Sequence, residues 1–251
     1  GSIEDLNRAS IEDVHSWFSS YYGPNNAVIV ISGDIKPAEA LARVKKYFGN
    51  IQPSPPIARQ SAWIAKRNGE HRQQVQDRVP QARLYKIWNI PQWGTDEADY
   101  LDLASSILAE GKNSRLYKRL VYDEELADSV SAFVDLREIA GLFYIIADAK
   151  PGVDLSRVEK AIDEELARFL ESGPKPEELE RVRTGYLTNF IKGLEKVGGF
   201  SGKADILARA ETFTGRPDYY KENLRHVRQA SPEIIKETAR KWLSDGVYVL
   251  E

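Results

Sequence analysis

The sequence predicts an α+β fold. Strand-like stretches come in pairs and helices are grouped after them, instead of alternating singly with strands. Of the 251 residues, 42% are hydrophobic and 29% are charged, which is ordinary for a globular protein. This length is enough for one large domain or two modest ones.

The first 52 residues are predicted to form a helix, a strand and a second helix. Ser10 is the expected N-cap of the first helix, which runs to about Tyr22, because apolar residues recur at helical spacing behind it. The stretch AVIVIS, residues 27–32, is predicted to be a buried strand. Pro37 then opens a helix that ends near Phe48.

Residues 53–58 are predicted to be a linker. Three of the four residues from Pro53 to Pro56 are prolines, which neither a helix interior nor a central strand accepts. Strands are predicted beyond it at about 74–79, 83–90, 127–135, 141–149 and in the final GVYVL. Helices are predicted at about 95–109, 114–122, 154–170, 176–197 and in two or three stretches after GGFSG.

A faint internal repeat indicates how the chain is organised. Ser10 and Ser231, 221 positions apart, each open a helix of similar length that feeds an apolar strand. Residues 1–52 are therefore predicted to be the tail of one domain, and residues 59–251 nearly all of a second, homologous domain. Gly1 and Ser2 resemble the remnant of a cleaved tag and no initiator Met is present, which favours a piece of a longer protein.

The stretch EGKNSRLY, residues 110–117, raises the question of a phosphate-binding loop. Asn113 follows the Gly-Lys pair where such a loop needs Ser or Thr, and Ser106 stands where it needs the first glycine. The residues are better explained as a turn between helices. Gly111 is predicted to end one helix in a left-handed conformation, and Asn113 or Ser114 to cap the next.

No catalytic constellation is found in the residues. The three histidines, His15, His71 and His226, have neither the HExxH nor the HxxEH spacing of zinc peptidases. We expect His15 to pack beside the apolar face of its helix, His71 to lie on an exposed strand edge and His226 on a basic helix face. There is no cysteine, and no G-x-S-x-G elbow occurs.

Net charge and hydropathy limit the classes of partner that the chain is expected to bind. The net charge is −3, so no general attraction to nucleic acid is expected. No apolar run is long enough to cross a membrane. The lack of cysteine is compatible with the cytoplasm or the bacterial periplasm and does not choose between them.

Three stretches in order resemble the pitrilysin/insulinase family of zinc metallopeptidases, most closely its bacterial branch similar to mitochondrial processing peptidase. They are SIEDVHSWFSSYYGPNNAVIVISGD, the proline-rich link, and GKNSRLYKRLVYDEELADSVSAF. The resemblance covers essentially the whole chain. It implies a mostly antiparallel sheet with helices packed on one face. Residues 59–251 then match the second domain of a subunit, which holds no zinc ligands.

The resemblance also implies a function. The chain is expected to be the non-catalytic C-terminal domain of a zinc metalloendopeptidase subunit that encloses peptides in a clamshell chamber. Zinc would belong to the missing upstream domain, and a second homologous half would be the partner. An inactive structural or assembly subunit, or a partner subunit that activates a separate zinc subunit, remains the alternative.

The resemblance points to a few positions that could face a substrate. Asn113, Ser114 and Arg115 are candidates, because free N–H groups at a helix start and a guanidinium can hold peptide carbonyls or carboxylates. Val121 and Asp128 occupy the positions where the partner half of active members usually carries an Arg and a Tyr. This departure makes the chain look less like the substrate-holding partner half.

Overall fold

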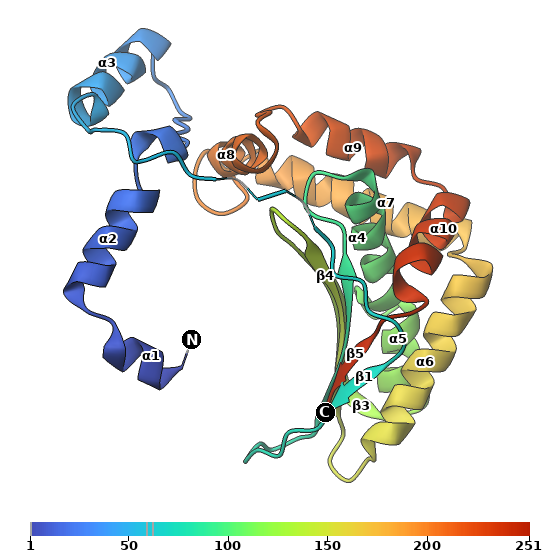
Figure 1. The fold of residues 1–251 in the computed structure, drawn as a ribbon. Coiled ribbons are helices and arrows are strands. Elements are labelled where there is room, and N and C mark those ends of the chain that lie inside the picture. Colours follow the sequence, from blue (N-terminus) through green and yellow to red (C-terminus); the bar gives the residue numbers. More distant parts are fainter. Residues whose placement is uncertain (1, 59, 62) are drawn as a thin grey trace. The chain divides into compact units, whose positions relative to one another are not determined.

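The computed structural model describes residues 2–58, 60–61 and 63–251 (Figure 1). The chain divides into two compact units. Unit 1 consists of Gly1–Gln60 and Ile191–Tyr220, and unit 2 of Ser61–Phe190 and Lys221–Glu251. The chain therefore passes between the units three times. The predicted division into 1–52, 53–58 and 59–251 rests on a presumed upstream domain and stays a prediction.

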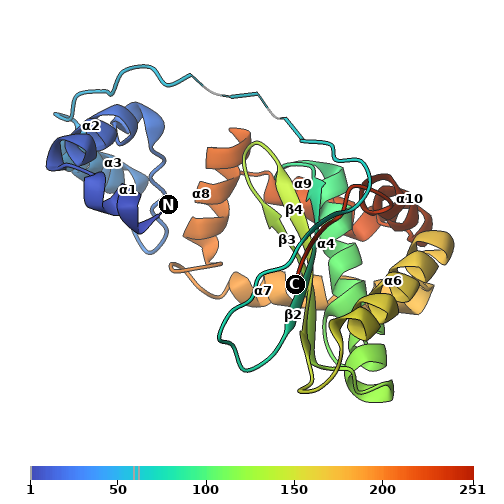
Figure 2. The ribbon, with the colours of Figure 1, turned by 60° about the horizontal axis from the view of Figure 1, so that its bottom comes forward.

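Unit 2 is built on a five-stranded sheet with the order β1-β5-β2-β4-β3. Only the β1–β5 pair is parallel; the other neighbours are antiparallel, as the family resemblance predicted. Figure 2 shows β2, β3 and β4 side by side. The strands are β1 His71–Gln73, β2 Arg83–Ile90, β3 Ala127–Leu136, β4 Gly141–Ala149 and β5 Tyr248–Leu250.

The helices of unit 2 cover one face of this sheet (Figure 1). Helices α4, α6 and α10 contact the strands directly, which confirms the predicted α+β arrangement. The helical elements are α4 Asp96–Ala109, α5 Arg115–Tyr117, a π-helical turn η2 Lys118–Asp123, α6 Leu155–Ser172, α7 Pro176–Gly193, α9 Tyr220–Gln229 and α10 Pro232–Leu243.

Alternation along the strands places the core between the sheet and these helices. In β2, Leu84, Trp88 and Ile90 point to the helical face and are fully or almost fully buried. Lys86 points the same way, and its ammonium lies 3.0 Å from Glu159 Oε1 and 2.6 Å from Asp163 Oδ1 on α6. These two carboxylates compensate the burial of the lysine charge.

The predicted strand at 74–79 is wrong. The strand is β1, which ends at Gln73, and the chain then projects past the end of the sheet (Figure 1). The neighbouring strand β5 ends at Leu250, and two further backbone bonds continue the pairing: Glu251 N–H donates to the Gln73 carbonyl at 3.0 Å, and Val75 N–H donates to the Glu251 carbonyl at 2.7 Å. Beyond these bonds the alternating residues have no strand to pair with.

Unit 1 contains four helices and one 3-10 turn within the residues described. They are α1 Ile3–Arg8, α2 Ile11–Tyr21, the turn η1 Pro24–Asn26, α3 Pro37–Phe48 and α8 Lys203–Thr214. Ser10 caps α2 as predicted: its Oγ accepts from Asp13 N–H at 3.1 Å, and Asp13 returns a bond to the Ser10 N–H. Helices α1, α2 and α3 bury no residue.

Two expectations for unit 1 are corrected. Residues 27–32, AVIVIS, form no strand, and Val28, Ile29 and Ile31 are each about half exposed. A strand needs a neighbour for its backbone groups, and the described residues supply none here. His15 is exposed and is not packed against an apolar face.

Candidate functional site

The turn at residues 111–115 has the predicted backbone. Gly111 follows the end of α4 with a φ of 77°, the left-handed conformation that glycine adopts without strain. Ser114 is the N-cap of α5, but its hydroxyl accepts no bond from the helix. It donates to the Gly111 carbonyl at 2.6 Å and is fully buried. Ser114 therefore closes the turn and presents no group to a ligand.

Arg115 is held inside unit 2. Its Nε and Nη2 donate to the two carboxylate oxygens of Glu178 on α7 at 2.8 and 2.6 Å, and Nη2 also donates to the Gly173 carbonyl. The guanidinium carbon lies 5.2 Å from the centre of the Phe169 ring. Burial opposes ionisation of Glu178, but the hydrogen bonds from Arg115 and Lys175 N–H outweigh it and lower the pKa of that carboxyl.

Asn113 differs from its two neighbours because its side chain is exposed. Val121 and Asp128, the two positions at which the partner half of active family members usually carries an Arg and a Tyr, differ in burial. Val121, in η2, packs against the core, whereas Asp128, in β3, is exposed and accepts a hydrogen bond from Gln81 Nε2. Of the five positions, only Asn113 and Asp128 have exposed side chains. A role in substrate binding for any of them stays a prediction.

The face of the sheet opposite the helices of unit 2, here called the open face, carries mostly aromatic and aliphatic side chains. Strand registers place Tyr85, Ile87, Tyr144, Ile146, Phe133, Tyr248 and Leu250 on it. Phe133 and Tyr144 are stacked at 5.0 Å between ring centres. Phe133 is 40% exposed. Such a face suits apolar side chains of a ligand or partner.

Charged groups border the open face. Arg83 Nε donates to Asp148 Oδ1 at 2.6 Å across the β2–β4 pair, and Ser129 Oγ donates to the other oxygen at 2.7 Å. The hydrogen bond from Arg83 lowers the pKa of Asp148 despite partial burial. These paired groups supply no free base or nucleophile, and the side chains described on the open face form no catalytic constellation.

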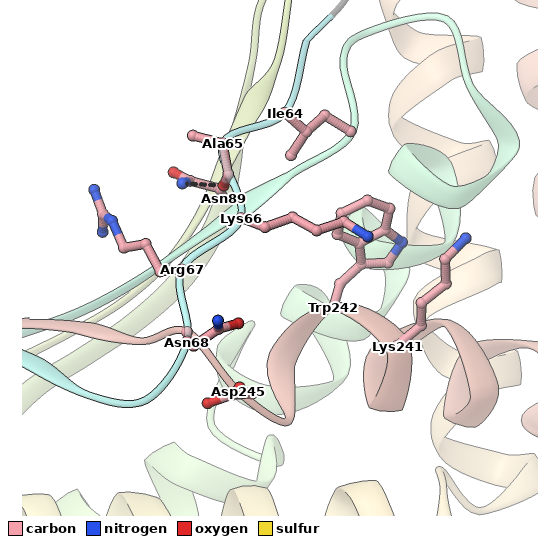
Figure 3. Close-up of a pocket in the computed structure, with 10 residues that line it drawn as sticks. Ile64, Ala65, Lys66, Arg67, Asn68, Asn89, Lys241, Trp242 and Asp245 are labelled. Atoms are coloured by element: carbon pink, nitrogen blue, oxygen red, sulfur yellow. Dashed lines mark hydrogen bonds between the residues drawn. The ribbon is translucent and has the colours of Figure 1, made fainter.

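A pocket of about 210 Å³ lies where the segment that follows the linker crosses unit 2 (Figure 3). Asn89 Nδ2 donates to the Ala65 carbonyl at 2.6 Å, and Gly69 N–H donates to Asp245 Oδ1 at 2.8 Å. Gly246 has a φ of 77°, and a Cβ there would lie 2.6 Å from the Arg67 carbonyl. The pocket is lined by Ile64, Ala65, Lys66, Arg67, Asn68, Asn89, Lys241, Trp242, Asp245 and Gly246. These bonds anchor the segment to unit 2.

A polar network joins α4, α7 and α9. Asp99 is 8% exposed and accepts from Asn223 Nδ2 at 2.7 Å, while His226 Nδ1 lies 2.7 Å from its other oxygen. Tyr186 completes the network by donating its hydroxyl to Asn223 Oδ1. The sequence pattern predicts only that His226 lies on a basic helix face, and it indicates no role for Asp99, Asn223 or Tyr186. Their partners lie up to 127 positions apart, so no local pattern could reveal them.

Burial governs the ionisation of the network. It raises the pKa of Asp99, and the hydrogen bonds from His226 and Asn223 act against that rise. Burial, together with the charge of Asp99, raises the pKa of Asp102, one turn further along α4, to about 6. Burial and these two carboxylates also raise the pKa of Tyr186.

The donor set does not fit a metal centre. No group of three or more His, Cys, Asp or Glu able to hold a metal occurs among residues 2–58, 60–61 and 63–251. His71 lies on β1, the exposed edge strand, as predicted, and His226 is engaged by Asp99. A search of the same residues also finds no helix long and apolar enough to span a membrane.

Comparison with known families decides the assignment. The family described as "Peptidase M16 inactive domain" matches residues 8–186. The chain belongs to this family. The predicted resemblance to pitrilysin-type zinc metallopeptidases is therefore confirmed, and the lack of a zinc ligand set agrees with the inactive type of M16 domain.

Relatives of this M16 domain are larger proteins. The zinc protease PqqE of Helicobacter pylori is 25% identical over 228 residues, covering 89% of this chain and 51% of the relative. The chain spans about half the length of the curated relatives it matches. A crystal structure of a protease from Helicobacter pylori has a TM-score of 0.90 at 21% identity, covering 100% of this chain and 61% of that one. At this identity the likeness shows the fold alone.

The same fold occurs in a multi-subunit assembly. A chain of Complex III2 from Candida albicans has a TM-score of 0.81 at 14% identity, and 99% of this M16 domain and 60% of that chain are covered. Relatives of this domain are thus parts of larger M16 proteins or of complexes.

Proposed function

We propose that this M16 domain is the non-catalytic C-terminal part of a zinc metalloendopeptidase subunit, and that the open face of its sheet forms one wall of a peptide chamber. The observation that carries the proposal is the one-sided cover of the sheet. The long helices of unit 2 lie against one face of the sheet (Figure 1), while strand registers place aromatic and aliphatic side chains on the open face.

The chemistry of this face suits enclosure of a peptide better than catalysis. Apolar side chains lose water when a peptide covers them, and the bordering Arg83–Asp148 pair is already neutralised. Zinc and the hydrolytic step would belong to the upstream domain. The chain alone would then bind no zinc tightly and cleave nothing.

The first experiment is to sequence the gene upstream of the codon for Ile3. An HxxEH motif followed by a downstream Glu supports a peptidase subunit. A degenerate motif contradicts it and favours the second candidate, a structural or assembly subunit. The fold-level likeness to a chain of Complex III2 supports considering that candidate. A partner subunit that activates a separate zinc subunit would instead restore activity to it on mixing.

The chamber role is tested in the full-length protein. Tyr144 lies on the open face, and Tyr47 is a 68% exposed tyrosine on α3 of unit 1. We expect Tyr144→Ala to raise KM for peptide cleavage severalfold with a smaller change in kcat, and Tyr47→Ala to change neither. Equal effects of the two substitutions on KM and kcat would contradict the proposal that the open face lines the chamber.

A further inference from the structure

Residues 191–220 leave unit 2 and return to it through two helices. Helix α7 carries the chain out at Phe190, and α9 brings it back at Lys221. Tyr186 precedes the exit by four residues, and Asn223 follows the return by two. The polar network therefore acts on the last turn before the segment and on the first turn after it. We call these two turns the stems of the segment.

The network ties both stems to α4. Asp99 uses one carboxylate oxygen for Asn223 and the other for His226, so it binds two successive turns of α9. Asn223 uses its amide nitrogen for Asp99 and its oxygen for the Tyr186 hydroxyl, so it bridges α4 and α7. Helix α4 is itself rooted in the core by Leu101, Leu103 and Ile107, which are fully or almost fully buried.

Both ring nitrogens of His226 lie within hydrogen-bond distance of a neighbouring side chain. Arg225 Nη2 lies 3.3 Å from His226 Nε2, and a guanidinium can only donate. On the other side of the ring, the Asp99 carboxylate can only accept, so His226 Nδ1 donates to it. Every polar atom that joins the stems to α4 thus has a partner of the right kind, which is the condition for a buried network to rigidify a fold.

Bends set the segment apart from its stems. Gly199 has a φ of 77° and Ser201 one of 63°, a conformation that costs a non-glycine residue energy. Ser201 N–H donates to Asp205 Oδ2 at 3.0 Å, and Gly215 ends α8 with a φ of 66°. Helix α8 lies between these bends, and Phe200 at the first bend is 93% exposed.

We propose that the Tyr186–Asn223–Asp99–His226 network is a latch, which holds the two stems together and thereby restricts the movement of residues 191–220. Breaking any bond between the stems leaves a buried polar atom without its partner and loosens the segment before it loosens the core. This inference is independent of the proposed chamber, because it concerns only how the segment is attached.

The test is hydrogen–deuterium exchange on the 251-residue chain. Tyr186→Phe removes only the hydroxyl that joins the stems, and Asn223→Ala removes the bridge between α4 and α7. The matched control is Thr188→Ala, which removes an exposed hydroxyl of the same helix that donates to the Thr184 carbonyl.

We expect amide exchange in α8 and the first turn of α9 to rise about fivefold in Tyr186→Phe and about tenfold or more in Asn223→Ala. Exchange in β2 and β4 should stay unchanged, and Thr188→Ala should behave as the unsubstituted chain. The double variant should show less than the product of the two single effects, because both remove the same connection.

Two results would overturn the latch. One is an equal rise of exchange in α8 and in β2 and β4, which would show a loss of global stability alone. The other is unchanged exchange in α8 in both variants.

Discussion

The two copies of the internal repeat have similar local sequences but differ in how far their apolar residues are buried. Helix α2 and helix α10 each begin after a serine N-cap, Ser10 and Ser231, whose side chain accepts a backbone N–H of the first turn. Helix α10 buries Ile235, Ala239 and Leu243 to 2% exposure or less. Helix α2 buries nothing, and the apolar residues of its stripe are between 40% and 63% exposed, namely Ile11, Val14, Trp17, Phe18 and Tyr21.

The strands after the two helices differ in the same way. Tyr248–Leu250 becomes β5 because β1 and β2 lie on either side of it. AVIVIS has stronger strand-forming residues and remains without a ladder. Helix capping is local and succeeds in both copies, whereas strand formation depends on neighbours and succeeds in one.

The largest expected effect comes from truncating equivalent residues of the two helices. Counting from the caps, Ile235 in α10 corresponds to Val14 in α2; Ile235 is 0% and Val14 44% exposed. We expect Ile235→Ala to lower the free energy of unfolding by about 2–5 kcal/mol, because it leaves a cavity in the core. Val14→Ala should change it by less than about 0.5 kcal/mol. Urea unfolding of both variants, followed by far-UV circular dichroism, measures the difference. Similar losses would refute the contrast.

The carboxylates of Asp13 in exposed helix α2 and Asp102 in buried helix α4 should change the stability in opposite directions as the pH falls. The pKa of Asp13 in α2 is lowered, first by the bond from Ser10 N–H. The pKa of Asp102 in α4 is raised to about 6, chiefly by burial. The folded chain then binds more protons than the unfolded chain at Asp102 between about pH 4 and 6, so this group makes stability fall as pH rises through that window.

Asp102→Asn removes this penalty. A shift of about two units corresponds to about 3 kcal/mol, and the partial exposure of Asp102 reduces the expected gain at pH 7.5 to about 1–2 kcal/mol. At pH 4 the gain should vanish, because the aspartic acid is already neutral. Thermal unfolding at the two pH values checks it. Asp99, Glu110 and Tyr186 also face this region, so a gain that persists at pH 4 would point to packing instead.

Removing the serine N-cap from α10 or from α2 should give a smaller difference in unfolding free energy between the two copies of the repeat. Ser231 Oγ accepts from Ile234 N–H at 3.2 Å, and Ser231→Ala should lower the free energy of unfolding of unit 2 by about 1 kcal/mol. Ser10→Ala removes an equivalent bond from α2. It should reduce the helix content without moving the unfolding midpoint of unit 2, because α2 contributes no buried residue. A shifted midpoint in Ser10→Ala would show that α2 stabilises unit 2.

The parts of the fold that were predictable are those with a strong local period or cap. Strand β4 was predicted as 141–149 and spans Gly141–Ala149, because alternate residues face the core along its whole length. The conformation of Gly111 was also predictable, since a helix end of this kind needs a left-handed residue.

The errors share one cause. The stretches 27–32 and 74–79 carry strand-like residues, yet the described chain offers neither of them a full partner. The candidate site shows the same limit in another form. Arg115 was a reasonable choice for holding a carboxylate, but its partner proved to be Glu178, 63 positions away. Sequence reasoning supplied the chemistry of such groups and could not supply their neighbours.

The smallest change in unfolding free energy is expected from a charge placed in AVIVIS. Ile29 is 50% exposed with unpaired backbone around it, which predicts self-association of the chain through this stretch. Ile29→Lys should leave the free energy of unfolding within about 0.5 kcal/mol of the unsubstituted chain and abolish the association. Val75→Lys is the matched control, since Val75 is 54% exposed in another extended stretch. Sedimentation across a concentration series measures both. A strictly monomeric unsubstituted chain, or equal effects of the two lysines, would mean that an unpaired apolar stretch is not by itself enough to recruit a neighbour.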